Sequence, residues 1–486
     1  MNAPRIRAPE LPDSLEWFNT RDGPVQLADL HGKVVLLHFW TYCCINCMHV
    51  LPELAALERR YPENLVVIGI HTPKFPNEKV TDNLQKAINR YYIRHPVAHD
   101  PSFSVWQQYT IKAWPSIIYI DPEGYIVGVL RGEGKGKQLD KMIQQSIKAA
   151  ETKKILASSK FPTRLKPEPD LELKFPGKVH IGHDRLFISD SGHNRVLECM
   201  PNGRIVQIYG SGAPGLLDGI GSETSFENPQ GLVQADNFLF IADTDNHVIR
   251  KVDLITWEVS TIAGMGKLGK VKTFDIYDDP LQVPLNSPWA LEYDNGTLYI
   301  AMAGSHQIWS MDLGKNTIKV LAGTGVEELQ DGNGHTAMFA QSSGLAIGED
   351  IEKTLFLVDA ETSSVRSIRI RDNYVSTIAG KGLFDFGDVD GKKEDALLQH
   401  PLDVAFDATR KVLWVVDSYN HKLRHVKISN GLVSSVKLSE QLHEPAGMSL
   451  KGDVLYIADT NAHRICSVDL NTGKMQELEV FKVETD

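Results

Sequence analysis

Three of the five cysteines in this 486-residue chain lie within five positions, at Cys43, Cys44 and Cys47. A cluster of this kind can carry out thiol–disulfide exchange, in which one thiolate attacks a disulfide sulfur and a second thiol releases the resulting mixed disulfide. The thiolate is the reactive form, so the chemistry depends on where the surrounding backbone places each sulfur.

The segments on either side of the cluster predict how it is held. Residues 33–40 form a continuous apolar run typical of a buried strand, and residues 47–61 carry apolar side chains at helical spacing. A thiol at the start of that helix faces unpaired backbone N–H groups and the positive end of the helix dipole, which lowers its pKa below about 8.5. Cys44 is therefore expected to attack, and Cys47, one turn inside, to resolve.

The rest of the first 150 residues alternates strands and helices. Further strands are expected over 65–70, 116–120 and 125–130, and further helices over 80–92 and 138–150. A strand–helix–strand–helix order followed by a hairpin and a helix predicts an α/β sheet covered by helices.

Two segments resemble thioredoxin-like oxidoreductases: Phe39 to Cys47, which includes Cys44-Ile-Asn-Cys47, and Ala113 to Asp121. The resemblance implies a cis-proline at Pro115, holding a backbone edge where an extended substrate pairs. The sequence departs from the family at Cys43, where a tryptophan is usual, and in its Ile-Asn dipeptide. It departs also at His38, where thioredoxin has an acid. His38 is either a proton relay for Cys47 or a packed strand histidine.

Other interpretations of the cysteines stay open. Cys44 and Cys47 could be buried structural thiols. Cys43-x-x-x-Cys47 also has the spacing used by copper-delivering relatives of the thioredoxin fold, with His71 or His99 as a third ligand for Cu(I). No fourth ligand at zinc-site spacing is visible, and no metal or cofactor is expected.

After residue 170, helical periodicity gives way to internal repeats. Six segments align on one column, at spacings of 42 to 59 residues, in or near the range of a four-stranded propeller blade. The column consists of Asp190, Asp243, Met302, Asp359, Asp417 and Asp459. Six such units are expected to close into a ring, with the column aspartates accepting hydrogen bonds from turn N–H groups.

A histidine column follows the aspartates and consists of His247, His306, His421 and His463. It is expected to pack repeat turns rather than to bind a metal. Asp388-Val-Asp390-Gly391 is similar to a calcium-binding loop. Its Asp-Gly pair occurs at the same repeat position as Asp-Gly pairs of two other blades, so it too is expected to be part of the repeat structure. Cys199 and Cys466 lie in apolar segments that are expected to form strands, and both are expected to be buried thiols.

The repeats resemble the NHL family of β-propellers, through entries such as Pro229-Gln-Gly-Leu and segments such as Ile241-Ala-Asp-Thr-Asp-Asn-His. Together with the Cys-Cys-Ile-Asn-Cys string, the order of a thioredoxin-like domain, a linker and six NHL blades resembles the NHL repeat-containing protein 2 family. The expected organisation is a thioredoxin-like domain over 1–150, a proline-containing linker over 151–170 and a six-bladed propeller over 171–486. The resemblance implies a cytosolic protein.

Composition limits the partners. Residues 1–150 carry a net charge of +2 and residues 171–486 carry −15, a poor match for a nucleic-acid backbone. No apolar run of 18 residues and no apolar leader stretch are present, so neither a membrane span nor a secretory signal is expected, and the default location is cytoplasmic.

Three functions follow as hypotheses. The first is a thiol–disulfide oxidoreductase acting on protein disulfides, with the propeller recruiting a partner protein. The second is a scaffold whose thioredoxin-like domain has lost or lowered its activity. The third is a propeller hydrolase or lyase with an axial metal. The sequence leaves the partner and the oligomeric state unknown.

Overall fold

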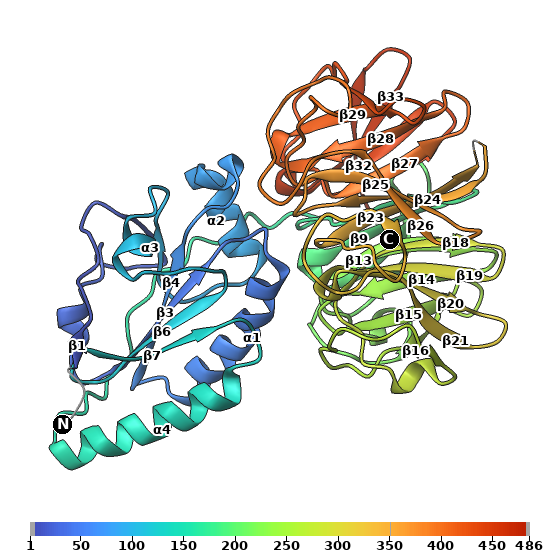
Figure 1. Ribbon diagram of the computed structural model, residues 1–486. Helices are drawn as coiled ribbons and strands as arrows, with labels where there is room; N and C mark the ends of the chain where they lie inside the picture. Colours follow the sequence, from blue (N-terminus) through green and yellow to red (C-terminus); the bar gives the residue numbers. More distant parts are fainter. Residues whose placement is uncertain (1–4, 350, 483–486) are drawn as a thin grey trace. The chain divides into compact units, whose positions relative to one another are not determined.

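The computed structural model describes residues 5–349 and 351–482. The chain divides into two compact units, Met1–Pro169 and Asp170–Asp486. The first is an α/β unit and the second is built from six β-sheets (Figure 1). The predicted fold class, a thioredoxin-like domain followed by a six-bladed propeller, is confirmed.

The first unit contains one seven-stranded sheet in the order β1-β7-β6-β3-β4-β5-β2. Its strands are β1 (Ile6–Arg7), β2 (Glu16–Phe18), β3 (Val34–Trp40), β4 (Leu65–His71), β5 (Val97–His99), β6 (Ser116–Ile120) and β7 (Tyr125–Arg131). β3, β4 and β5 are parallel, while β6 pairs antiparallel with β3 and with β7. The sequence predicted the central strands but missed the short strands β1, β2 and β5.

Four α-helices accompany this sheet: α1 (Ile45–Arg60), α2 (Thr81–Arg90), α3 (Ser104–Gln108) and α4 (Gly136–Lys153). Two 3-10 helices, η1 (Leu27–Leu30) and η2 (Pro76–Lys79), lie in its loops. Leu54 of α1 and Ile143 of α4 share a buried cluster with Leu36 of β3. Side chains alternate along a strand, so His38 projects from β3 toward the same face as Leu36.

Residues 151–170, the expected linker, contain the end of α4 and a segment bonded to the first unit. The Ala157 N–H donates to the Gly32 carbonyl at 2.9 Å and the Arg164 N–H donates to the Asn19 carbonyl at 3.2 Å. Lys86 and Asn89 of α2 both bind the Glu168 carboxylate. The segment therefore lies along the first unit as far as residue 168.

Each sheet of the second unit is one blade built from consecutive strands. Blade 1 contains β8 (Val179–Ile181), β9 (Leu186–Asp190), β10 (Arg195–Cys199) and β11 (Ile205–Tyr209); blade 2 contains β13 (Pro229–Ala235), β14 (Phe238–Asp243), β15 (Val248–Asp253) and β16 (Glu258–Ala263); blade 3 contains β18 (Pro288–Asp294), β19 (Thr297–Met302), β20 (Gln307–Asp312) and β21 (Thr317–Ala322).

Blade 4 contains β23 (Ser342–Glu349), β24 (Lys353–Asp359), β25 (Ser364–Arg369) and β26 (Tyr374–Ala379); blade 5 contains β27 (Asp403–Asp407), β28 (Val412–Asp417), β29 (Lys422–Lys427) and β30 (Leu432–Ser435); blade 6 contains β31 (Gly447–Lys451), β32 (Val454–Asp459), β33 (Arg464–Asp469) and β34 (Met475–Leu478). The two-residue strands β12 (Gly219–Ile220), β17 (Ile276–Tyr277) and β22 (Gly332–Asn333) extend the outer edges of blades 2, 3 and 4.

Blades 1 and 6 close the ring. Their inner strands, β8 and β31, contact each other, and the Thr460 hydroxyl of blade 6 donates to the Pro176 carbonyl at 2.8 Å. Near the end of the chain, the Phe481 carbonyl accepts from the Ile205 N–H of blade 1 at 2.8 Å. Closure leaves each inner strand with a neighbour on both sides, as the repeat pattern requires.

The histidine column joins adjacent blades. At each of the six junctions, a residue with φ between 49° and 57° accepts a hydrogen bond from a backbone N–H of the next blade, at 3.0 to 3.2 Å. The pairs are Asn194 with Asn228, His247 with Ser287, His306 with Gln341, Ser363 with His400, His421 with Glu444 and His463 with Phe175. The predicted role of the histidines in repeat turns is confirmed.

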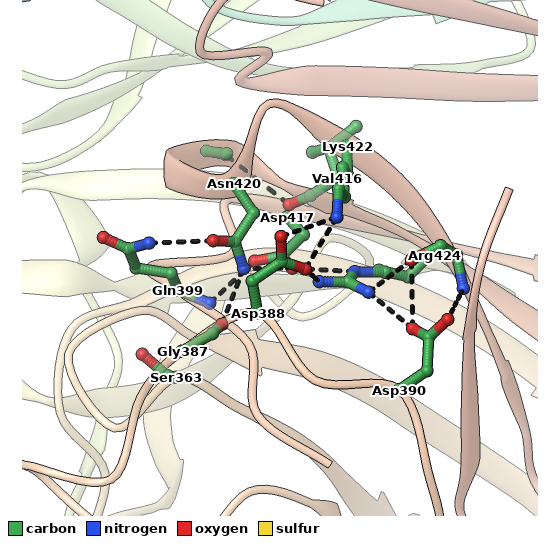
Figure 2. A network of polar contacts seen from close by, with 12 residues as sticks. Ser363, Gly387, Asp388, Asp390, Gln399, Val416, Asp417, Asn420, Lys422 and Arg424 are labelled. Carbon is green, nitrogen blue, oxygen red and sulfur yellow. Dashed lines mark hydrogen bonds and ion pairs between the residues drawn. The ribbon is translucent and has the colours of Figure 1, made fainter. Parts of the chain in front are cut away.

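The aspartate column accepts turn N–H groups in five blades, at 2.5 to 2.9 Å, as predicted. In blade 5, Asp417 also binds Arg424, whose guanidinium reaches Asp388 and Asp390 (Figure 2). Lys422 neutralises Asp388 from the other side. The carboxylates of the segment that is similar to a calcium-binding loop, Asp388 and Asp390, are thus paired with cations of the same blade.

Blade 3 replaces the buried ion pair with an apolar pair. Asp243 of blade 2 pairs at 2.8 Å with Arg250, seven residues later, and both side chains are fully buried. In blade 3 the same positions hold Met302 and Trp309, also buried. Aspartate and arginine are lost together, which avoids an uncompensated charge in the interior.

Candidate active site

The cysteine segment lies between β3 and α1, as predicted. Cys44 is the N-cap of α1, and its carbonyl accepts the N–H groups of Cys47 at 3.0 Å and Met48 at 3.2 Å. All three clustered cysteines are free thiols; Cys44 is partly exposed, whereas Cys43 and Cys47 are buried. Of the three, Cys44 is the sulfur that a disulfide substrate can reach from solvent.

The environment of Cys47 favours the protonated thiol. Burial raises the pKa of Cys47 well above its usual range, and a hydrogen bond with the Cys44 side chain raises it further. A hydrogen bond from the Thr41 backbone to the Cys47 sulfur acts in the opposite direction. In the propeller, burial raises the pKa of Cys199 and of Cys466 to about 12, which fits the prediction that both are packed strand thiols.

The sequence missed Glu78, a residue of η2 that lies beneath the cysteine segment. Its side chain is fully buried, and its Oε1 accepts the Thr41 hydroxyl at 2.6 Å and the Cys43 N–H at 3.1 Å. Its Oε2 accepts the N–H groups of Lys74 at 2.7 Å and Phe75 at 2.9 Å. Nothing in the spacing of the cysteines signals a carboxylate 31 residues beyond Cys47.

His38 lies in β3, between β6 and β4, and its side chain is fully buried. Neither ring nitrogen has a hydrogen-bond partner among the described residues, and burial lowers its pKa to about 3. An imidazole with that pKa stays neutral at physiological pH and is a weak proton acceptor. These observations favour the packed strand histidine over the relay, and its role at the site stays a prediction.

Pro115 follows a cis peptide bond with Trp114, as the resemblance implies. Its carbonyl accepts the Gly132 N–H at 3.0 Å, and β6 begins at the next residue. The Trp114 ring packs against Trp106 with 4.5 Å between centroids. The substrate-pairing role of Pro115 stays a prediction.

His71 and His99, the candidate third ligands for copper, lie side by side at the ends of β4 and β5. Their rings are 5.3 Å apart, and burial lowers the pKa of both. Over residues 5–349 and 351–482, no group of three or more histidine, cysteine, aspartate or glutamate side chains is arranged to hold a metal ion. The geometry therefore offers copper no three-ligand set in that part of the chain.

A lysine crosses the propeller axis. The ammonium group of Lys178, which precedes β8 in blade 1, donates to the carbonyls of Ser343 at 3.0 Å and Leu402 at 2.7 Å and lies 3.2 Å from the Asp403 carboxylate. Ser343 belongs to blade 4, opposite blade 1 in a ring of six. The ammonium group of Lys178 therefore links blade 1 to blades 4 and 5 in the interior of the ring.

Comparison with known proteins agrees with both units. A family model described as thioredoxin-like matches residues 32–126. The human protein named NHL repeat-containing protein 2 is 39% identical over 526 aligned residues, which cover 99% of this chain and 72% of the human one. The chain belongs to the NHL repeat-containing protein 2 family. The family resemblance predicted from the cysteine string and the repeats is confirmed.

Two other relatives extend the comparison. An Arabidopsis thaliana protein named SUPPRESSOR OF QUENCHING 1, chloroplastic, is 38% identical over 98% of this chain and 48% of its own length. The thiol-disulfide oxidoreductase ResA of Oceanobacillus iheyensis is 34% identical over 22% of this chain and 54% of its own length. Within the described ranges, no helix is long and apolar enough to cross a membrane. The cytoplasmic location stays a prediction.

Proposed function

We propose that the chain is a thiol–disulfide oxidoreductase that acts on protein disulfides through Cys44 and Cys47. The observation that carries the proposal is the position of Cys44, a partly exposed thiol at the N-cap of a 16-residue helix with a buried partner thiol one turn inside. A substrate disulfide can reach the Cys44 sulfur, and burial raises the pKa of Cys47, which keeps that thiol protonated until the second step.

The reaction has two steps. The Cys44 thiolate attacks one sulfur of the substrate disulfide, forms a mixed disulfide and releases the other substrate sulfur as a thiolate. Cys47 then loses its proton and attacks the Cys44 sulfur, which forms the Cys44–Cys47 disulfide and releases the second substrate thiol. The substrate gains two electrons and the protein loses two, so turnover requires a thiol reductant.

The propeller has the second role in this proposal, that of binding a partner protein. Six blades locked to each other by side chain to backbone hydrogen bonds form a rigid platform. Lys178 lies in the interior of the ring, and the carboxylates of Asp388 and Asp390 are paired with Arg424. Both observations favour the binding of a partner protein over metal-dependent catalysis in this unit.

The test is the reduction of insulin disulfides by dithiothreitol in the presence of the full chain. The Cys44→Ser variant should lower the rate to that of dithiothreitol alone. Reduced Cys47→Ser, incubated with insulin after the dithiothreitol has been removed, should accumulate a mixed disulfide detectable by mass spectrometry. Cys466→Ala, at a buried propeller thiol, is the matched control and should keep the wild-type rate. Full activity of Cys44→Ser would contradict the proposal, and a wild-type rate no higher than that of dithiothreitol alone would favour the scaffold.

A further inference from the structure

The loop between β7 and α4, residues 131–137, concentrates positive charge beside the cysteine segment. It contains Arg131, Lys135 and Lys137 and a single acid, Glu133, so its net charge is +2. Among the described residues, none of the three basic side chains has a hydrogen-bond or ion-pair partner. These cations are therefore available to a ligand.

The strand register places Arg131 at the cysteine end of the sheet. Ser116 pairs with Phe39 of β3 on one side and with Arg131 of β7 on the other. Neighbouring strands lie about 4.8 Å apart, so the backbone of Arg131 is about 10 Å from that of Phe39, five residues before Cys44. An extended peptide advances about 3.3 Å per residue. Arg131 therefore lies within reach of substrate residues about three positions from a cysteine that reacts with Cys44.

Hydrogen bonds hold the loop against the helix that begins after Cys44. The Oε2 atom of Glu133 lies 2.5 Å from Nδ1 of His49, in the second turn of α1. The Lys135 N–H donates to Oε2 of Glu53, one turn further along the same helix, at 3.2 Å. The carboxylate of the loop is thus engaged with α1, whereas its basic side chains are not.

One side of the loop is open to solvent. Gly132 and Gly134 have φ of 75° and 71°, and apart from their chain neighbours no atom lies within 4 Å of the position that a Cβ would occupy at either residue. The Gly132 N–H donates to the Pro115 carbonyl at 3.0 Å, so the open side adjoins the cis-proline. A peptide can approach the backbone of the loop at this point without a side chain in the way.

We propose that the disulfides reduced at Cys44 belong to acidic protein segments, whose carboxylates, within about four residues of the reacting cysteine, bind Arg131 and Lys135. The inference rests on the proposed function and names its substrate class; the reduced chain supplies the two electrons as described above. Carboxylates form charge-assisted hydrogen bonds with unpaired guanidinium and ammonium groups, whereas basic segments are repelled by them.

The experiment mixes the reduced full chain, freed of reductant, with peptides that contain one cysteine flanked by glutamate, glutamine or lysine. Each peptide is oxidised to a disulfide dimer with a self-quenched fluorophore, and the rate of dequenching is divided by the rate of the same peptide with dithiothreitol, which corrects for intrinsic reactivity. At low ionic strength, the glutamate peptide should react about threefold faster than the glutamine peptide and about tenfold faster than the lysine peptide, the size of one or two exposed ion pairs. In about 0.5 M NaCl, where the Debye length is about 4 Å, all ratios should fall below about twofold.

Two double variants test the loop itself. Arg131→Gln/Lys135→Gln should bring the normalised rates of the glutamate and glutamine peptides within about 1.5-fold of each other and keep the glutamine rate within about twofold of the wild-type rate. The matched control, Lys148→Gln/Lys160→Gln, removes the same charge from two exposed lysines and should keep the wild-type preference. Lys148 lies about 18 Å along α4 from the first residue of that helix, and Lys160 lies near the start of β4, at the opposite end of the sheet.

The outcomes separate the substrate class from the reaction. Equal normalised rates for the three peptides, or a preference that Arg131→Gln/Lys135→Gln retains or that the control also loses, would overturn the acidic substrate class and leave the proposed function intact. A faster normalised reduction of glutathione disulfide than of the glutamate peptide would assign the loop to small anionic disulfides and overturn it as well. A wild-type chain that reduces no peptide faster than Cys44→Ser does would contradict the proposed function itself.

Discussion

The Nδ1 atom of His421 in blade 5 accepts a hydrogen bond from the backbone N–H of Glu444, which leads into blade 6, at 3.0 Å. His421 has φ of 55° and Glu444 has φ of 46°, so the bond joins two left-handed turns. Burial lowers the pKa of His421 and keeps the ring neutral, which an acceptor nitrogen requires. The same relationship recurs at every junction of the ring, with histidine, asparagine or serine as acceptor.

This junction predicts losses of stability of different size for two substitutions. His421→Ala removes the acceptor and places alanine at a positive φ, so the free energy of unfolding should fall by about 2–3 kcal/mol. His421→Asn should cost less than about 1 kcal/mol, because asparagine tolerates this conformation and Asn194 fills the same role at the first junction. Urea unfolding of the full chain measures both. Equal losses for Ala and Asn would show that the acceptor does not matter.

The buried ion pair of blade 2 gives a second prediction. Burial raises the pKa of Asp243 to about 6, and Arg250 works against that rise. Arg250→Met should therefore destabilise the chain by about 3–5 kcal/mol, because it leaves an uncompensated buried carboxylate. The double variant Asp243→Met/Arg250→Met, which removes both charges as blade 3 does, should be more stable than the single one. A double variant that is less stable than Arg250→Met would contradict the argument from the uncompensated charge. The measurement is denaturant unfolding.

A third prediction concerns acid stability. His38 has a pKa of about 3 when folded and about 6.5 when unfolded, so the unfolded state binds more protons between these values. Stability is full above pH 6.5 and falls as the pH drops toward 3. Between pH 6 and pH 4, the free energy of unfolding of His38→Leu should therefore fall by about 2–3 kcal/mol less than that of the wild-type chain. His183→Gln, at an exposed histidine, is the control for the same unfolding measurements and should leave the pH dependence unchanged.

A fourth prediction separates Cys43 from the exchange reaction. Its side chain is 3% exposed, and its backbone N–H binds Glu78. A protein disulfide cannot reach that sulfur, and alanine keeps the N–H, so Cys43→Ala should retain insulin reduction within about threefold of the wild-type rate. Loss of activity comparable to Cys44→Ser, in a variant with an unchanged melting temperature, would make Cys43 a third reacting thiol.

The sequence by itself determined the features that depend on local spacing. Cys44 and Cys47 are three residues apart at a helix start, so a strand-to-helix pattern was enough to place them together. The six blades were visible because each repeats the same turn, with Asp243 and His247 in blade 2 matched by Asp417 and His421 in blade 5. Periodicity of this kind reports how each segment folds with its immediate neighbours.

Only the tertiary structure decided which distant residues meet. Glu78 reaches Thr41 across 37 positions, and Lys178 reaches Ser343 across 165. The relation of His421 to Glu444 depends on how two blades are placed side by side. The contacts of Glu78 and Lys178 repeat no pattern in the chain, because buried polar groups are satisfied by whichever donors the packed elements bring within reach, and that is settled only when the elements assemble.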